Sequence, residues 1–463
     1  MRVSEVRAEF EGVDLGDPRL TKRVQKMAEA LAARPDASLP TAMGSVAARE
    51  AAYRFLANPR VTFERVIAAH VDATVERARE RKEVLVVSDT TEFKFSTERE
   101  GLGLLSRNRR EGFVAHFTLV VSADGRRTPL GVLGVETIVR EGRKGHRNNL
   151  ARKKDPNRES LRWHRGATAA SERLGGVEAI HVMDREADMY ELLSALVTNN
   201  QRFVIRSGQE RLVEEGLLST AIASTPLRFT REVQLSARTG ARQPGSRRTH
   251  PPRRGRLANL AVSTTQITLP KPKAAIDPAL RASITVNVVR VWEPEPEPDE
   301  SPVEWRLFTT EPVDTQEQVE RIVDSYRARW VIEEYFKALK TGCDIEQSQL
   351  ESLDTIQNLL GIYIPVAWQL LVLRSVARDE PARPATDALS TLQIAVLRLI
   401  IRGKPLPSDP TVGDVAAAIG ELGGHIKSNG PPGWQVLGRG FEELRRAEFL
   451  YKQMRSAISR DQS

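Results

Sequence analysis

Three acidic residues that lie far apart in the sequence could do chemistry together if the fold brought them into one site. Asp89 and Asp184 follow short apolar runs at 84–87 and 179–183, and Glu333 lies in an amphipathic segment. Both runs are typical of buried strands, and neighbouring strands of one sheet would place the aspartates at the same end. Three convergent carboxylates suit Mg²⁺ or Mn²⁺, which leave coordination positions open for substrate phosphate. Two such ions can stabilise both oxygens of an in-line displacement at phosphorus.

Basic and aromatic residues accompany Glu333 along one predicted helix that runs from about residue 315 to Lys340. Tyr326, Arg329, Glu333 and Lys340 follow one another at spacings of three, four and seven residues, which places them on one helical face. Arg329 and Lys340 would then position a phosphate. The alternative is an ordinary amphipathic helix with an i,i+4 ion pair between Arg329 and Glu333. The residues expected to anchor this helix on the core are Val319, Val323, Trp330 and Leu339.

Composition narrows the class of protein. The chain has 463 residues, of which 40% are hydrophobic and 28% charged, so wholesale disorder is excluded. A single cysteine, Cys343, excludes an intramolecular disulfide framework and a cysteine-rich zinc module. The N-terminus lacks the apolar core of a secretory signal, and the apolar stretch 359–373 is short for a membrane span. We therefore expect a soluble intracellular protein that does not bind membranes.

Positive charge is concentrated in two blocks. Residues 140–165 hold ten basic and three acidic residues, and residues 238–256 hold seven arginines and no acid. The whole chain has a formal net charge of +8, whereas residues 1–80 are nearly neutral. Two separate basic blocks favour a polyanionic partner, and the alternative is two solvated loops.

The order of predicted elements indicates an α/β protein. Residues 17–80 read as helices, 84–207 as strands with two helices among them, and 210–302 as alternating antiparallel strands. The residues after about 314 read as helices, starting from a capping box at Asp314 to Glu317. Strands and helices interrupted by a block of strands predict an α/β core with an inserted β subdomain.

Several ordered strings resemble one enzyme family. The string 326–342 keeps every spacing of the Tyr-Arg-Glu-Lys signature of DDE cut-and-paste transposases of the insertion-sequence-four family, and it is most similar to the transposon-five type. Strings similar to other motifs of this family are SDTTEF (88–93), VMDREADMYELL (182–193), QRFVIRS (201–207), WRLFTTEPV (305–313), LGDPRLTKR (15–23) and AAYRFLANP (51–59). They are collinear and cover most of the chain.

This resemblance implies a fold: a ribonuclease-H-like catalytic core with an inserted antiparallel β subdomain, an N-terminal helical DNA-binding domain and a C-terminal helical region. The implied divisions are 1–78 for DNA binding, 79–209 and 303–375 for the core, 210–302 for the insertion, and 376–463 for dimerisation. Asp89, Asp184 and Glu333 would be the catalytic metal ligands. They would hold two Mg²⁺ ions per active site, for which Mn²⁺ could substitute.

The resemblance also implies the reaction, which is nicking of transposon ends, hairpin formation and resolution, and strand transfer into target DNA. The residues implied near the scissile phosphate are Tyr326, Arg329, Lys340 and Arg206, with Trp305 stacking on a flipped base. Those implied at the terminal inverted repeat are Arg19, Lys22, Arg23 and Arg54. The partners would be double-stranded DNA and a second copy of the chain in a paired-end complex, in the bacterial cytoplasm with the nucleoid.

Two alternatives stay open. The first is a non-catalytic DNA-binding inhibitor or architectural protein derived from a transposase. The second is a structure-selective nuclease built on the same core. The three acids and the N-terminal helices argue against the first, and Trp305 and the long β insertion argue against the second.

Overall fold

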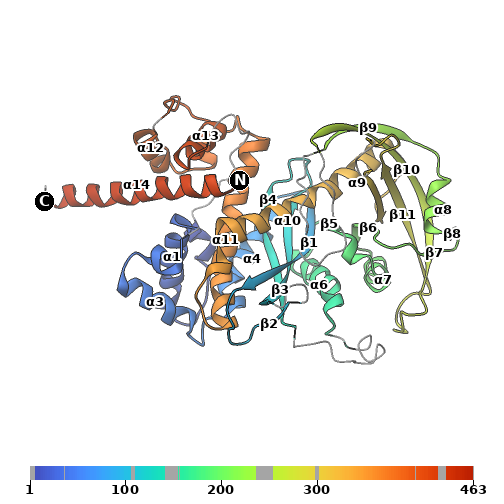
Figure 1. Cartoon of the computed structure of the whole chain (residues 1–463), viewed down its shortest axis with the longest axis horizontal. Coiled ribbons are helices and arrows are strands. Elements are labelled where there is room, and N and C mark those ends of the chain that lie inside the picture. Colours follow the sequence, from blue (N-terminus) through green and yellow to red (C-terminus); the bar gives the residue numbers. More distant parts are fainter. Residues whose placement is uncertain are drawn as a thin grey trace.

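The computed structural model describes residues 6–35, 37–105, 110–140, 155, 157–235, 254–297, 302–401, 403–425 and 434–461. Most of the two basic blocks predicted at 140–165 and 238–256 lies outside the described residues. The described part is a mixed α/β structure in which helices flank one large sheet (Figure 1).

The N-terminal part is helical, as predicted. Its elements are η1 (Val6–Phe10), α1 (Pro18–Ala33), α2 (Leu39–Met43), α3 (Val46–Leu56) and α4 (Phe63–Arg79). A side chain caps the start of each α-helix by accepting a backbone N–H, and these caps are Asp17, Ser38, Ser45 and Thr62.

The middle of the sheet holds the strands that carry the aspartates. These strands are β1 (Val84–Phe95), β2 (Gly103–Leu104), β3 (Glu111–Ser122), β4 (Pro129–Ile138), β5 (Ala179–Met183) and β6 (Arg202–Arg206). β1 pairs antiparallel with β3 and parallel with β5, and β5 pairs parallel with β6. The prediction that β1 ends at Asp89 is wrong, because Asp89 pairs with Phe117 and the strand continues to Phe95.

The predicted β insertion continues this sheet. Its long strands are β9 (Phe229–Leu235), β10 (Arg256–Pro270) and β11 (Ser283–Trp292), followed by β12 (Glu304–Thr309). Within the described residues the order is β2-β3-β1-β5-β6-β12-β11-β10-β9, with β4 beside β3. The antiparallel pairing of these strands is confirmed, and β12 joins them to β6. A hairpin of β7 (Leu212–Val213) and β8 (Gly216–Leu217) precedes α8 (Leu218–Ala223).

Helices cover both faces of the central strands. Between β4 and β6 lie η2 (Glu159–Leu161), α6 (Arg162–Leu174), η3 (Arg185–Ala187) and α7 (Tyr190–Thr198). The long helix α11 (Leu353–Asp379) is apolar enough to cross a membrane by length and composition, but 89% of its most apolar window is buried inside the protein. The apolar stretch 359–373 therefore lies inside a largely buried helix.

The C-terminal part is helical. It consists of η6 (Ala385–Asp387), α12 (Thr391–Ile400), α13 (Val412–Leu422) and α14 (Trp434–Asp461). Figure 1 shows the C-terminal end of α14 projecting away from the rest of the chain.

The predicted single helix around Glu333 consists of consecutive pieces. α9 (Gln316–Ala328) begins with a capping box of Thr315 and Gln318, one residue later than predicted. The helix is interrupted at Arg329, resumes as α10 (Trp330–Lys337), and becomes a π-helical turn, η4 (Ala338–Gly342), before η5 (Ile345–Gln347).

Three of the four predicted anchors of this helix are confirmed as buried: Val319, Val323 and Leu339. The prediction for Trp330 is wrong, because its side chain is 56% exposed. Trp330 follows the interruption at Arg329, and Val331 and Ile332 are the buried residues in this turn.

Candidate active site

Arg329 joins two of the three predicted acids. Its guanidinium donates to Asp89 Oδ2 at 2.7 Å and to Glu333 Oε1 at 3.4 Å. The Arg329 and Asp89 side chains are each 13% exposed, and that of Glu333 is 38% exposed. Asp89 comes from β1, whereas Arg329 and Glu333 come from the interruption between α9 and α10 and from α10 itself. The sheet and this helix therefore meet at the predicted site.

Asp184 follows β5, which lies beside β1. Its Oδ1 accepts the backbone N–H of Glu186 at 2.8 Å, and Asp89 Oδ1 accepts that of Thr90 at 2.7 Å. Asp184 is close enough to raise the pKa of Asp89. The structure thus places the three predicted acids close enough for the charges of Asp184 and Glu333 to act on Asp89.

Burial raises the pKa of Asp89 to about 7. The negative charges of Asp184 and Glu333 raise this pKa too, and Arg329 opposes them. A carboxyl with so high a pKa is short of positive charge, even with a guanidinium beside it. Such a set of acids would gain from a divalent cation.

The three acids fit a divalent metal by donor type and by charge. In the described residues, however, no group of three or more His, Cys, Asp and Glu side chains is arranged to hold a metal ion. Arg329 supplies the positive charge between Asp89 and Glu333 instead. A cation at these carboxylates would therefore compete with the guanidinium for them.

Lys340 does not join the other signature residues. It lies in the π-helical turn η4, where its ammonium donates to the carbonyl of Glu92 and lies 3.7 Å from Glu346. Burial lowers its pKa. That all four signature residues share one helical face stays a prediction, since Arg329 keeps helical backbone angles and Lys340 lies in the π-helical turn.

Tyr326 and Trp305 contact each other. Tyr326 is buried, and its ring meets that of Trp305 edge to face, with centroids 5.3 Å apart. Arg206, at the end of β6, donates to the carbonyl of Glu304 at 3.1 Å. Arg206 and Trp305 therefore lie at the same pair of neighbouring strands.

The predicted contacts in the N-terminal helices lie on α1 and α3. Arg19 is exposed and pairs with Asp17 at 2.9 Å, and Arg54 lies 3.8 Å from Glu50. Lys22 is exposed and Arg23 is half-buried. Their side chains are thus at or near the surface of the N-terminal part.

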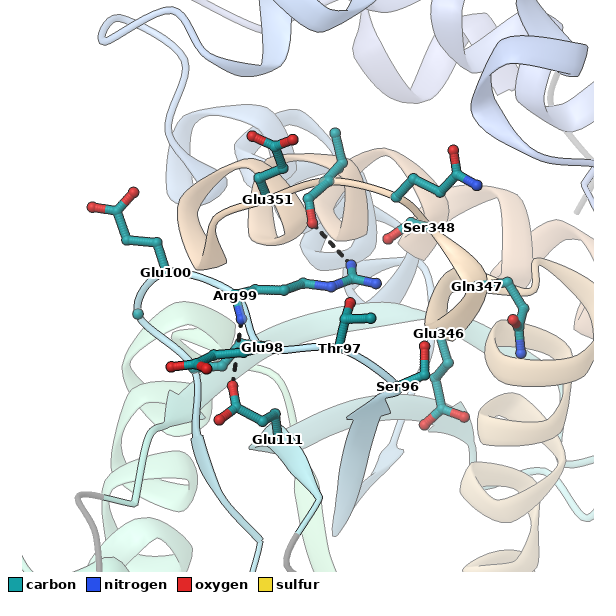
Figure 2. Close-up of a pocket in the computed structure, with 14 residues that line it drawn as sticks. Ser96, Thr97, Glu98, Arg99, Glu100, Glu111, Glu346, Gln347, Ser348 and Glu351 are labelled. Carbon is teal, nitrogen blue, oxygen red and sulfur yellow. Dashed lines mark hydrogen bonds between the residues drawn. The ribbon is translucent and has the colours of Figure 1, made fainter.

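A polar cavity of about 890 Å³ lies between residues 96–102 and residues 346–351 (Figure 2). Arg99 crosses it and donates to the carbonyl of Leu350 at 2.9 Å. Glu346 lines the cavity, accepts the backbone N–H of Lys94 at 3.0 Å, and pairs with Lys340. The other carboxylates of its wall are Glu98, Glu100, Glu111 and Glu351. The sequence analysis did not predict this cavity, since its walls come from separate loops.

Comparisons with known families locate two domains in this chain. Residues 4–61 match the family model described as transposase DNA-binding, and residues 136–366 match the transposase DDE domain. The chain carries a transposase DNA-binding domain and a DDE transposase domain. The second match includes Asp184 and Glu333, whereas Asp89 lies between the two matched segments. These matches confirm a transposase DNA-binding domain in the N-terminal part and a DDE domain after it.

A similar solved structure is that of the piggyBac transposase in a synaptic complex with hairpin DNA. The two chains are 9% identical, with a TM-score of 0.31, and the likeness covers 64% of this chain. This chain spans about half (48%) of the length of that transposase.

Proposed function

We propose that this chain is a cut-and-paste DNA transposase of the insertion-sequence-four type. In this proposal Asp89, Asp184 and Glu333 would hold two divalent ions, Mg²⁺ or Mn²⁺, which would supply activation of the attacking oxygen and charge stabilisation for a displacement at phosphorus. The observation that carries the proposal is the meeting of these acids around Arg329, in a chain with a DDE transposase domain.

The strand order supports a ribonuclease-H-like core in this proposal. Three antiparallel strands, β4, β3 and β1, are followed across the sheet by the parallel strands β5 and β6. The proposed catalytic acids then lie on β1, just after β5, and on α10. This arrangement fits the core that the sequence resemblance implies.

The surrounding residues act on DNA in the proposed reaction. Arg329 contacts the scissile phosphate once it leaves the carboxylates, because its planar guanidinium suits phosphate oxygens. Arg206 and Tyr326 position the strand beside it, and Trp305 takes up a flipped base during hairpin formation. Lys340 reaches the backbone after release from Glu346. The substrates are the terminal inverted repeats, contacted by Arg19, Lys22, Arg23 and Arg54, and target DNA.

The proposal further includes a homodimer, in which residues 376–463 contact the second copy and the two transposon ends are paired. It places the protein in the bacterial cytoplasm with the nucleoid. The domain divisions implied by the resemblance belong to the same proposal.

A cleavage assay tests the central claim. Duplexes carrying the DNA that flanks the coding sequence on each side are incubated with wild type, Asp184→Asn or Glu178→Gln, in Mg²⁺ and in excess chelator. Glu178 is the matched control, since it lies just before β5 and its side chain is 68% exposed. We expect metal-dependent cutting at the terminal inverted repeats. The cleavage rate should fall about a thousandfold or more in Asp184→Asn and stay within about twofold of wild type in Glu178→Gln.

Each contrary outcome has a meaning. Equal cutting by wild type and Asp184→Asn overturns the catalytic assignment. Binding of the repeats without cutting in either Mg²⁺ or Mn²⁺ identifies a non-catalytic DNA-binding protein instead. Cutting without joining to a supercoiled target identifies a nuclease.

A further inference from the structure

One buried arginine, which the proposed mechanism does not use, connects the two strands that carry the aspartates. Arg162 is the first residue of α6 and is only 8% exposed. Its Nε donates to Thr90 Oγ1 at 2.9 Å, and its Nη2 donates to a Glu186 carboxylate oxygen at 2.9 Å. Its Nη1 donates to the carbonyl of Glu159 at 3.1 Å, which fixes the guanidinium on its own element.

The two residues that Arg162 holds are the same two that orient the aspartates. The backbone N–H of Thr90 donates to Asp89 Oδ1 at 2.7 Å, and that of Glu186 donates to Asp184 Oδ1 at 2.8 Å. The Arg162 side chain thus links Thr90, whose backbone N–H orients Asp89, to Glu186, whose backbone N–H orients Asp184. Since the guanidinium is rigid, the distance between its two acceptors is narrowly set.

His116 completes the Thr90 end of this connection. Its Nδ1 lies 2.9 Å from Thr90 Oγ1, and the ring is 2% exposed. Burial, with Arg162 and Arg165 nearby, lowers the pKa of His116 to about 3, so the ring is neutral near pH 7. The Thr90 hydroxyl thus lies between the Arg162 guanidinium and His116 Nδ1. Thr90 therefore has a partner on each side and little freedom to rotate.

We propose that Arg162 and Thr90 are positioning residues that set the separation of the Asp89 and Asp184 carboxylates for the divalent ions. This inference rests on the proposed function and deepens it. Neither residue touches the reacting atoms. Their effect reaches the site through the backbone donors of Thr90 and Glu186, as outer hydrogen bonds do at other metal sites.

Manganese binding to the full chain tests the inference directly. Free Mn²⁺ is measured by electron paramagnetic resonance for wild type, Thr90→Val, Thr90→Ser, Arg162→Met and Asp184→Asn. The matched control is Arg165→Met, because Arg165 lies on the same helix but donates to Glu136 at 3.1 Å. We expect Thr90→Val and Arg162→Met to bind Mn²⁺ about 10–100-fold more weakly, and Thr90→Ser and Arg165→Met to bind within about threefold of wild type.

Two further readouts separate positioning from folding. The melting temperature and the affinity for repeat DNA should stay near wild type in Thr90→Val, which nearly preserves side-chain shape. In single-turnover cleavage, the maximal rate constant should fall in Thr90→Val and Arg162→Met, whereas the protein concentration that gives half of this rate should not change. Recovery of Mn²⁺ affinity in Thr90→Ser would assign the effect to the hydroxyl.

The outcomes distinguish the inference from the proposed function. If wild type binds Mn²⁺ no better than Asp184→Asn, the proposed metal site itself fails. If Asp184→Asn loses the metal but folded Thr90→Val and Arg162→Met bind it like wild type, only the positioning role is overturned. Equal weakening in Arg165→Met would likewise overturn it, because the loss would then follow from any change in α6.

Discussion

Arg329 neutralises carboxylates that burial and mutual repulsion leave short of positive charge. Asp89 has a pKa of about 7 with the guanidinium already beside it. A divalent cation at the same carboxylates would repel the guanidinium at short range. In the proposed function, metal loading and the release of Arg329 toward a phosphate are therefore linked events.

Arg329→Gln should have opposite effects on metal binding and on cleavage. Because the guanidinium no longer competes with the ion, Mn²⁺ affinity in the absence of DNA should rise by about threefold or more. A threefold rise corresponds to about 0.7 kcal/mol. Cleavage should fall by about tenfold or more, because a phosphate contact is lost. The measurements are Mn²⁺ titration and single-turnover cleavage.

Arg327→Gln is the matched control for this change. Arg327 lies two residues earlier in the chain and pairs with Asp324 at 3.0 Å, away from Asp89. Arg327→Gln should leave both the Mn²⁺ affinity and the cleavage rate near their wild-type values. Weaker Mn²⁺ binding in Arg329→Gln would show that the arginine supports the carboxylates rather than competing for them.

The sequence could predict one half of the Arg329 interactions. Its ion pair with Glu333 follows from the spacing of four residues on a helix, and the structure shows this pair at 3.4 Å. Its shorter contact with Asp89 joins residues 240 positions apart and depends on how α10 lies against the sheet. The role of Thr90 and Arg162 was missed for the same reason, because their contacts are made by tertiary packing.

Among the helices, α4 and α11 pack closely against each other at a glycine. A Cβ at Gly361 would lie 3.0 Å from Val66 Cγ1 and 3.2 Å from its Cβ. Val66 is fully buried and β-branched, so its side chain has little room to move. This contact fixes the position of α11 against the N-terminal helices.

Gly361→Ala should therefore destabilise the protein, although alanine is the better helix former. The gain of about 1 kcal/mol in helix propensity is outweighed by overpacking of about 1–3 kcal/mol. Denaturant unfolding gives the free-energy change. The control is Gly438→Ala in α14, where a new Cβ meets nothing within 4 Å and should stabilise by about 0.5–1 kcal/mol. A gain at both positions would show that α4 and α11 can separate freely.

Apolar periodicity predicted the helices themselves well, and the run 179–183 matches β5 residue for residue. It could not predict the interruption at Arg329 or the π-helical turn at Ala338–Gly342. An ideal helix of 3.6 residues per turn therefore describes the segment from Tyr326 to Lys340 only approximately. Lys340 lies in the π turn and contacts Glu92 and Glu346, and such turns are frequent at functional sites.

At the scale of the whole molecule, a buried polar cluster ties the N-terminal part to the sheet. Glu9 of η1 contacts His70 Nδ1 at 2.6 Å and Arg77 Nη1 at 2.8 Å, both from α4. His70 Nε2 accepts the backbone N–H of Val132 in β4 at 3.1 Å. Burial alone would raise the pKa of Glu9, but the His70 hydrogen bond and the Arg77 contacts lower it to about 2.

Glu9→Gln should make the free energy of unfolding less dependent on pH in the acid range. The folded pKa of Glu9 is below its usual value of 4.5, so its carboxylate stabilises the fold above that pH, and this contribution is lost as the pH falls toward 2. The loss at pH 7 should be on the order of 3 kcal/mol, and the difference from wild type should shrink between pH 4.5 and 3.

Thermal unfolding at a series of pH values measures this difference. Glu29→Gln is the control, since Glu29 lies 3.6 Å from Arg7 with its side chain 44% exposed. It should change stability by less than about 1 kcal/mol at every pH. A Glu9→Gln deficit that is constant across the acid range would assign the effect to packing rather than to charge.

The order of strands across the molecule was only partly predictable. Alternation of apolar and polar residues predicted that residues 210–302 form antiparallel strands, which the structure confirms. It could not show that β12 pairs with β6, because alternation defines the faces of a strand and not its partner. The pairing of the insertion with the central sheet is therefore determined by tertiary structure and not by the local sequence pattern.

That shared sheet has a mechanical consequence. From β9 at one edge to β1 in the middle, each strand is laddered to the next by peptide groups. If the outer strands bind a DNA duplex in the proposed function, a force on them would be transmitted through the backbone hydrogen bonds of the sheet to β5, the strand that precedes Asp184. DNA binding at the edge of the sheet and the alignment of the catalytic carboxylates would then be mechanically coupled.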